Sequence, residues 1–356
     1  MTLIIAEAGV NHNGNEQLAF ALVDAAVAAG ADIVKFQTFN AKALATAEAP
    51  QANYQRNNTG QTESQLAMLK RLELSYDTHL RLQAYCQTRG IGFLSTAFDE
   101  SSLQFLLGPL KLNLLKIPSG EITNAPFILQ HARSGHNLIV STGMATLAEI
   151  EAALGVIAFG YTTPEDSMPS LQAFATSYAS TQGQQALQQK VTLLHCTTEY
   201  PAPPEDINLR AMDTMASAFG LPVGYSDHSA GITIAVAAVA RGATVLEKHF
   251  TLDKNLPGPD HKASLDPKEL AAMVCAIREV NLALGDGIKR PAASELANKA
   301  VARKSLVAAQ TIKAGEPLSA NLLACKRPGT GLSPYRYWEL LGKTANRSYL
   351  EGELLE

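Results

Sequence analysis

Short apolar runs alternate with longer stretches rich in alanine and leucine along the first 285 residues. The runs have the length of buried strands in a parallel sheet and lie at 3–8, 32–36, 91–95, 114–117, 138–141, 191–195, 221–225 and 244–246. The stretches between them predict helices at 16–29, 76–88, 125–133, 147–159, 209–218, 233–240 and 267–284.

Strands that alternate with helices form right-handed βαβ units. Eight such units in about 285 residues match the size of a (β/α)8 barrel. An open doubly wound sheet is the alternative, but the turn after the first run has no G-x-G-x-x-G motif, which argues against a dinucleotide-binding version. We therefore predict an α/β fold built on a TIM barrel.

The pattern changes after Gly285, where Asp-Gly-Ile-Lys-Arg-Pro interrupts the helical periodicity and a polar stretch follows. Beyond it come short strand-like pieces separated by turn residues. We predict a barrel domain at 1–285, a linker at 286–302 and a small β-rich domain at 303–356. A Gly-Glu-x-Leu motif occurs twice in the small domain, at Gly315 and Gly352.

Composition places the chain among globular proteins, with 46% hydrophobic and 17% charged residues. The net charge of −4 argues against nucleic-acid binding, and no apolar stretch is long enough for a membrane span. The first residues lack the basic region of a signal peptide. Four cysteines without paired spacing predict a reduced, cytoplasmic protein without structural zinc.

The charge is unevenly divided. Residues 286–356 carry 11 Lys and Arg against 7 Asp and Glu, a net charge of +4, so that the first 285 residues carry −8. A basic small domain beside an acidic barrel is consistent with docking of one on the other, although a chance distribution is the alternative.

Polar side chains follow seven of the eight runs. In a barrel, the carboxyl ends of all strands meet at one face, where active sites form. Side chains alternate between the two faces of a strand, so residues two apart point the same way. The pairs that share a face are Lys35 with Gln37, Ser119 with Glu121, Ser226 with His228, and Glu247 with His249. We expect them to form one site.

Two histidines stand at the ends of consecutive strands, His228 and His249. Neighbouring strands lie about 4.8 Å apart, so both imidazoles can reach one cation, and neutral imidazole suits Mn, Fe, Co or Zn. A pair of hydrogen-bonded histidines is the alternative.

Lys35 is predicted to point into the barrel, where a buried lysine needs an anion. Hydroxyl groups at other strand ends form a ring around it, from Thr96, Ser119, Ser141 and Ser226. Lysine and hydroxyl donors suit a phosphate or a carboxylate. Capping of the following helices is the alternative role of the hydroxyls.

Two carboxylates, Glu7 near the end of the first run and Glu121 after the fourth, suit general acid or base catalysis, although each can equally be a structural group. Asp260 ends a rigid Pro-Gly-Pro-Asp turn and either binds sugar hydroxyls or caps its loop. His12 lies in an Asn-His-Asn-Gly turn and either reaches the barrel mouth or orders that turn.

Nine segments taken together resemble the sialic acid synthase family. They are IAEAGVNHNG at 5–14, VKFQT at 34–38, KIPSGE at 116–121, LIVSTGM at 138–144, LHCTTEYP at 194–201, GYSDH at 224–228, EKHF at 247–250, PGPD at 257–260 and KRPG at 326–329. They run in order over nearly the whole chain, and this set is far more specific than any one of them.

The resemblance implies a TIM barrel followed by an antifreeze-like (SAF) domain. It implies condensation of phosphoenolpyruvate with an N-acylated hexosamine, typically N-acetylmannosamine, and water, giving N-acetylneuraminate and phosphate. It also implies a divalent cation, usually Mn²⁺, and a domain-swapped homodimer in which the small domain of one subunit covers the barrel mouth of the other.

The resemblance assigns roles to individual residues. His228 and His249 match the metal ligands, and Glu7 matches a catalytic or water-orienting carboxylate near the metal. The phosphoenolpyruvate contacts match Lys35, Thr96, Ser119, Ser141 and Ser226, with Thr198 where an asparagine often stands. The amino-sugar contacts match Gln37, Glu121, Tyr200 and Asp260, and Arg327 matches an arginine that the partner's small domain directs at the N-acyl group. Glu7, Lys35 and Glu121 form the expected catalytic set.

The sugar itself stays open. A legionaminic acid synthase, which uses 2,4-diacetamido-2,4,6-trideoxymannose, fits the same motifs, and the two sugars differ at C4 and C6. A pseudaminic acid synthase or a non-catalytic sugar-binding protein fits less well. Residues 161–190 are longer than the corresponding family loop and rich in Gln, Ser and Ala. We expect this insertion to lie away from the catalytic face.

Overall fold

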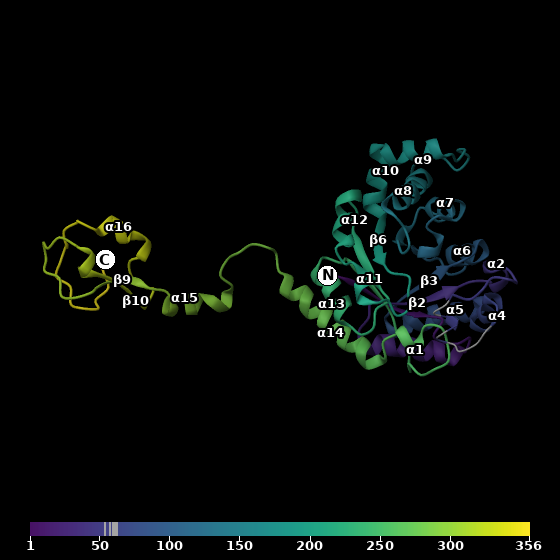
Figure 1. Cartoon of the computed structure of the whole chain (residues 1–356), viewed down its shortest axis with the longest axis horizontal. Helices are drawn as coiled ribbons and strands as arrows, with labels where there is room; N and C mark the ends of the chain where they lie inside the picture. Colours follow the sequence, from purple (N-terminus) through teal and green to yellow (C-terminus); the bar gives the residue numbers. More distant parts are fainter. Residues whose placement is uncertain (53–54, 57, 59–62) are drawn as a thin grey trace. The chain divides into compact units, whose positions relative to one another are not determined.

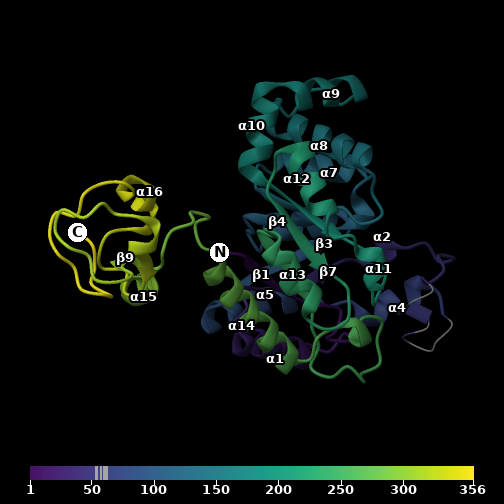
Figure 2. The same cartoon turned by 60° about the vertical axis from the view of Figure 1, so that its left-hand side comes forward.

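The computed structural model describes residues 1–52, 55–56, 58 and 63–356. The chain divides into two compact units, Met1–Gly285 and Asp286–Glu356. The first unit is a closed barrel in which β1 to β8 follow one another in sequence order and β8 pairs with β1 in parallel. Figures 1 and 2 show helices around these strands. The predicted TIM barrel is therefore confirmed and the open sheet is excluded.

The barrel strands are β1 (Leu3–Gly9), β2 (Ile33–Thr38), β3 (Gly92–Ala97), β4 (Leu114–Ile117), β5 (Asn137–Ser141), β6 (Val191–Cys196), β7 (Val223–Asp227) and β8 (Val245–His249). Several extend further toward their carboxyl ends than the apolar runs predict. Asp227 ends β7 and His249 ends β8, because buried polar residues continue the ladder there. The chemistry at these positions therefore stands on strands and not on loops.

The helices described in the first unit are α1 (Glu16–Ala29), α2 (Ala41–Leu44), α4 (Gln65–Leu72), α5 (Tyr76–Arg89), α6 (Glu100–Leu107), α7 (Ala125–Arg133), α8 (Leu147–Thr162), α9 (Leu171–Ala179), α10 (Thr181–Lys190), α11 (Pro204–Ile207), α12 (Ala211–Phe219), α13 (Thr233–Ala240) and α14 (Pro267–Leu284). Sequence periodicity did not predict α6, which starts where the Asp99 side chain accepts a hydrogen bond from the Ser102 backbone N–H. No helix in the described part of the chain is long and apolar enough to cross a membrane.

The insertion at 161–190 forms α9 and α10, which pack on α8 outside the barrel (Figure 1). The N-terminal cap of α10 is Ser180, whose side chain accepts from the Gly183 backbone N–H. None of the residues that line the cavity at the strand ends comes from these two helices.

The second unit contains α15 (Leu296–Ala302), β9 (Ser305–Ala308), β10 (Leu323–Lys326) and α16 (Tyr337–Leu340). β9 and β10 pair antiparallel, and single bridges such as Ile312 with Tyr349 extend the sheet. A small aliphatic core that includes Leu306 and Leu318 holds the unit together. The segment expected to be a linker thus contains the helix α15.

The repeated Gly-Glu-x-Leu motif has one structural role at both places. Gly315 and Gly352 each adopt a φ of +82°, a left-handed conformation that glycine accommodates without strain. The glutamate after each glycine accepts a backbone N–H three residues back, from Lys313 to Glu316 and from Leu350 to Glu353. The motif therefore builds a tight turn twice.

Candidate active site at the barrel mouth

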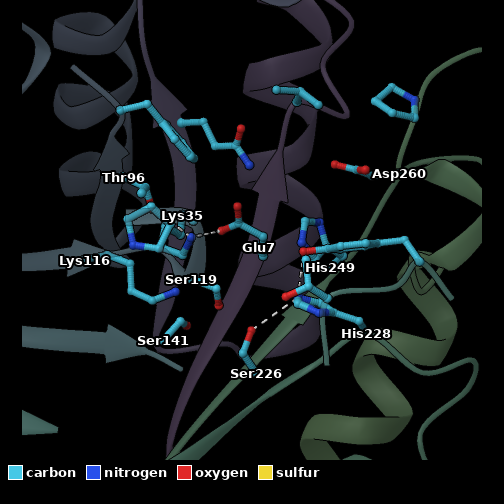
Figure 3. A pocket seen from close by; sticks show the side chains of 18 of the residues that line it. Glu7, Lys35, Thr96, Lys116, Ser119, Ser141, Ser226, His228, His249 and Asp260 are labelled. Carbon is cyan, nitrogen blue, oxygen red and sulfur yellow. Dashed lines mark hydrogen bonds and ion pairs between the residues drawn. The ribbon is translucent and has the colours of Figure 1, made fainter. Parts of the chain in front are cut away.

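A cavity of about 340 Å³ opens at the carboxyl ends of the barrel strands. It is lined by every site residue predicted in the barrel, namely Glu7, Lys35, Gln37, Thr96, Ser119, Glu121, Ser141, Thr198, Tyr200, Ser226, His228, His249 and Asp260. Ten of its side chains are labelled in Figure 3. Arg327 lies in the second unit, so its predicted contact with the sugar stays a prediction.

Lys35 is the centre of a buried network of charged groups. Its Nζ lies 2.6 Å from Glu7 Oε2, 3.1 Å from Thr96 Oγ1 and 3.6 Å from Glu247 Oε2 (Figure 3). Burial opposes the charge on Lys35, but Glu247 and Glu7 raise the pKa of this amine above its ordinary value. Burial raises the pKa of Glu7 to about 7, even though Lys35 opposes the change.

Two further members of this network, Lys116 and Glu247, were not assigned a role from the sequence. Lys116 Nζ lies 3.0 and 3.1 Å from the two carboxylate oxygens of Glu247. Burial alone would raise the pKa of Glu247, but Lys116 and Lys35 hold it well below its usual range. Strand alternation placed Glu247 on the face of His249, and that signal identifies it as a site residue.

The hydroxyl groups face the cavity instead of capping helices. The helices that follow β3, β4 and β5 are capped by Asp99, Asn124 and Thr146. Ser226 Oγ donates to Glu247 Oε1 over 2.8 Å, and Ser119 Oγ accepts from the Gly143 backbone N–H over 3.0 Å. Within the described residues, the buried Thr198 Oγ1 has no hydrogen-bond partner. These hydroxyls are therefore placed to bind a ligand anion.

The two histidines lie side by side, with ring centroids 5.5 Å apart. His228 Nδ1 donates to the Thr197 carbonyl over 2.6 Å, so its Nε2 is the acceptor, and Tyr200 Oη approaches it at 3.1 Å. The buried Nδ1 of His249 has no hydrogen-bond partner among the described residues. Both ring nitrogens of His228 therefore have hydrogen-bond partners, so the alternative of two hydrogen-bonded histidines holds for His228 and not for His249.

Both imidazoles are in the form that binds metal ions. Burial lowers the pKa of His228 to about 4 and the pKa of His249 well below its ordinary value, so both rings are neutral. The described residues contain no cluster of three or more His, Cys, Asp or Glu side chains arranged around one ion. A pair of neutral histidines with one unpartnered nitrogen fits a cation whose remaining positions are open to water and substrate.

Buried contacts among Asp227, Ser229 and Lys248, here called the clasp, hold the ends of β7 and β8 together behind these histidines. Lys248 Nζ lies 2.8 Å from Asp227 Oδ2 and donates to the Ser229 carbonyl over 2.5 Å. Asp227 Oδ1 accepts from the Ser229 backbone N–H over 2.8 Å. Because Asp227 precedes His228 and Lys248 precedes His249, the clasp fixes the register of both histidines.

Replacing Lys248 with methionine is expected to lower the free energy of unfolding by about 3–5 kcal/mol, because Asp227 would stay buried without its partner. Lys254→Met is the matched control. Lys254 pairs with Glu269 at the surface, and the loss of that pair should cost no more than about 1 kcal/mol. Urea unfolding of both variants measures the difference, and equal costs would contradict a structural role for the clasp.

Two further predicted residues that line the cavity, Glu121 and Asp260, come after the ends of β4 and β8. Asp260 is buried, which raises its pKa to about 6, and its side chain makes no capping hydrogen bond to the short helix His261–Ala263 that follows it. Glu121 is half-buried and accepts from Asn124 Nδ2 over 2.7 Å. His12 does not line the cavity, and its Nδ1 accepts from the Gly14 backbone N–H over 3.0 Å. For His12, ordering of the turn is therefore the role that the structure supports.

A model of the NeuB family matches residues 22–289, and a model of the SAF domain matches residues 303–356. The chain belongs to the NeuB family. The predicted sialic acid synthase family and the predicted barrel with an SAF domain are both confirmed.

Two curated relatives align with almost the whole NeuB chain. N,N'-diacetyllegionaminic acid synthase of Campylobacter jejuni is 49% identical over 99% of this chain and 98% of its own length. The enzyme of the same name from Legionella pneumophila is 44% identical over 99% of this chain and 92% of its own. A crystal structure of N-acetylneuraminic acid synthetase from Leptospira borgpetersenii, in complex with citrate, shares 33% identity and a TM-score of 0.66 over 83% of this chain and 90% of that one.

Proposed function

We propose that this NeuB-family protein is an N,N'-diacetyllegionaminic acid synthase. It condenses phosphoenolpyruvate with 2,4-diacetamido-2,4,6-trideoxymannose and water, releasing phosphate. The observation that carries this proposal is the 49% and 44% identity, over 99% of the chain, to two synthases of that name. The similarity thus favours the alternative sugar over N-acetylmannosamine, which was the main expectation from the sequence.

Phosphoenolpyruvate has two anionic groups, and the floor of the cavity supplies donors for both. Lys35 and Lys116 bring positive charge, and the hydroxyls of Ser119, Ser141 and Ser226 line the same cavity. Charge-assisted hydrogen bonds from lysine to phosphate or carboxylate are strong in a buried site. These groups bind the substrate and stabilise phosphate as it departs.

We further propose that His228 and His249 hold a divalent ion, with Mn²⁺ as the usual ion. The basis is chemical fit: two buried neutral imidazoles, one of which has an Nδ1 without a partner among the described residues. When bound, such an ion polarises the aldehyde carbonyl of the open-chain sugar. The protein's own contribution is to present both nitrogens in fixed orientation, through the Thr197 carbonyl on one ring and the clasp behind both.

The reaction then needs one carbon–carbon bond formed and one carbon–oxygen bond broken. C3 of enolpyruvate attacks the aldehyde carbon, and the aldehyde oxygen takes up a proton. Water adds to C2 and loses a proton, and cleavage of the C2–O bond releases phosphate. We assign exchange of the water's proton to Glu7, because this carboxylate lines the cavity, pairs with Lys35 and has a pKa that burial raises to about 7.

Outer residues of the cavity suit the amino sugar. Gln37, Glu121, Tyr200 and Asp260 offer donors and acceptors for amide and hydroxyl groups, and all four line the cavity.

Exposed Arg327 of the small domain is proposed to reach the N-acyl group from a partner subunit in a domain-swapped homodimer. The +4 charge of residues 286–356 against −8 for the rest supports this docking.

Phosphate release from phosphoenolpyruvate with Mn²⁺ tests the proposal. Parallel reactions contain the diacetamido sugar, N-acetylmannosamine or no sugar. We expect kcat/KM to be at least about tenfold higher for the diacetamido sugar than for N-acetylmannosamine, with no release when sugar is omitted. Equal or better use of N-acetylmannosamine would reverse the choice of sugar, and no release with either would refute the synthase.

A further inference from the structure

The cavity has an apolar wall as well as a polar floor. The apolar wall consists of Val10, Leu44, Met68, Leu69, Leu72 and Phe98, which line the same cavity as the lysines and histidines. It comes from the turn after β1, from α2 and α4, and from the residue that follows β3. Val10 lies in the first family segment, but the other five wall residues lie outside all nine segments.

The wall residues pack together in a hydrophobic cluster of their own. Val10, Met68 and Leu72 belong to a small buried cluster that is separate from the main barrel core. Leu44, Leu69 and Phe98 pack against that cluster while only partly buried. The three half-buried side chains therefore keep apolar surface available to whatever occupies the cavity.

The position of the wall along the barrel axis indicates which part of the sugar it meets. The reactive groups Glu7, Lys35 and His249 lie within strands. Val10 and Phe98 directly follow the carboxyl ends of β1 and β3, and the other four wall residues pack in the same cluster, so the wall stands above the reactive floor. The aldehyde carbon C1 has to lie at the floor to react. The far end of an open-chain hexose, C4 to C6, therefore extends outward to the level of the wall.

We propose that the apolar wall binds the C6 methyl group and the methyl of the C4 acetamido group, and that it selects the diacetamido sugar over N-acetylmannosamine. This inference rests on the proposed synthase function. Apolar surface gains free energy when it buries a methyl group, whereas a hydroxyl buried there loses its hydrogen bonds to water. N-acetylmannosamine carries hydroxyls at both C4 and C6.

Leu69→Gln tests the wall directly, with Leu44→Gln as a second variant. At saturating phosphoenolpyruvate we expect kcat/KM for the diacetamido sugar to fall about tenfold, with little change for N-acetylmannosamine and in the KM of phosphoenolpyruvate. Leu80→Gln is the matched control, since Leu80 is an exposed leucine of α5 that does not line the cavity. It should keep the wild-type preference.

A synthetic sugar separates the two methyl groups without any mutation. The 6-deoxy form of N-acetylmannosamine differs from the parent only at C6, and we expect the wild-type protein to use it about tenfold better than N-acetylmannosamine.

Wild-type selectivity in both wall variants, together with no preference for the 6-deoxy sugar, would overturn the wall's role and leave the synthase proposal standing. An equal loss with both sugars would also overturn it. Failure of the wild-type protein to release phosphate with any sugar would instead refute the proposed function itself.

Discussion

His249→Ala is expected to lower turnover by about a thousandfold or more at every Mn²⁺ concentration, while the protein stays folded. The substitution removes one of the two ring nitrogens proposed to hold the ion. Polarisation of a carbonyl by a metal is worth several kcal/mol, and each 1.4 kcal/mol is about a tenfold change in rate. Folding should survive, because the Nδ1 of His249 makes no hydrogen bond within the described residues.

Mn²⁺ binding to the variant, measured by titration calorimetry, separates the metal role from catalysis. We expect affinity to fall by at least about a hundredfold relative to the wild-type protein. His136→Ala is the matched control, because His136 precedes β5 at the opposite end of the barrel and does not line the cavity. Wild-type Mn²⁺ affinity in His249→Ala would show that this histidine is not a ligand.

Strand alternation and barrel geometry predicted most of the candidate site. Lys35, Ser226 and His249 all stand at the carboxyl ends of strands, and closure of the barrel brings such ends to one face whatever the loops do. The sequence of each strand predicts which way a side chain points, and the barrel fold brings the side chains of different strands together. It therefore holds for residues that lie within or directly after a strand.

Pairing across the barrel could not be predicted in the same way. Lys116 is on β4 and Glu247 is on β8, and these strands are not neighbours in the sheet. Their ion pair depends on the length of both side chains and on the width of the barrel interior, neither of which leaves a pattern in the sequence. Alternation indicated that Glu247 faces inward but not which cation it meets.

The apolar wall could not be predicted from the sequence, for a different reason. Met68 and Leu69 follow the helical spacing of apolar residues that every core-facing helix shows. Whether such a face packs on the barrel or borders a cavity depends on where the segment between β2 and α5 folds. The choice between two sugars that differ in a methyl and an acetamido group depends on surfaces of this kind, so the motifs left it open.

Lys35→Met is the second change with a large expected effect, because it removes the cation at the centre of the buried network. Glu247 would keep its negative charge in a site that has to accept a phosphate and a carboxylate, with Lys116 as its remaining partner. The pKa of Glu7, which Lys35 lowers, would rise, so this carboxylate would shift toward the neutral acid. We expect kcat/KM for phosphoenolpyruvate to fall by about a thousandfold or more, since an uncompensated buried charge costs several kcal/mol. Steady-state kinetics together with calorimetric titration of phosphoenolpyruvate measure the effect, and unchanged binding would contradict the assignment.

The same variant tests the proposed domain-swapped dimer when it is coexpressed with Arg327→Ala, which alone should weaken use of the sugar by about a hundredfold. In a swapped dimer, a mixed pair has one site built from the intact barrel of one subunit and the intact small domain of the other. Random pairing should then restore about a quarter of wild-type activity.

Coexpression of Lys35→Met with His249→Ala is the control, because both defects lie in the barrel and no mixed site is intact. If the two mixtures are equally inactive, Arg327 does not act across subunits, and full activity of Arg327→Ala alone would remove its role in binding the sugar.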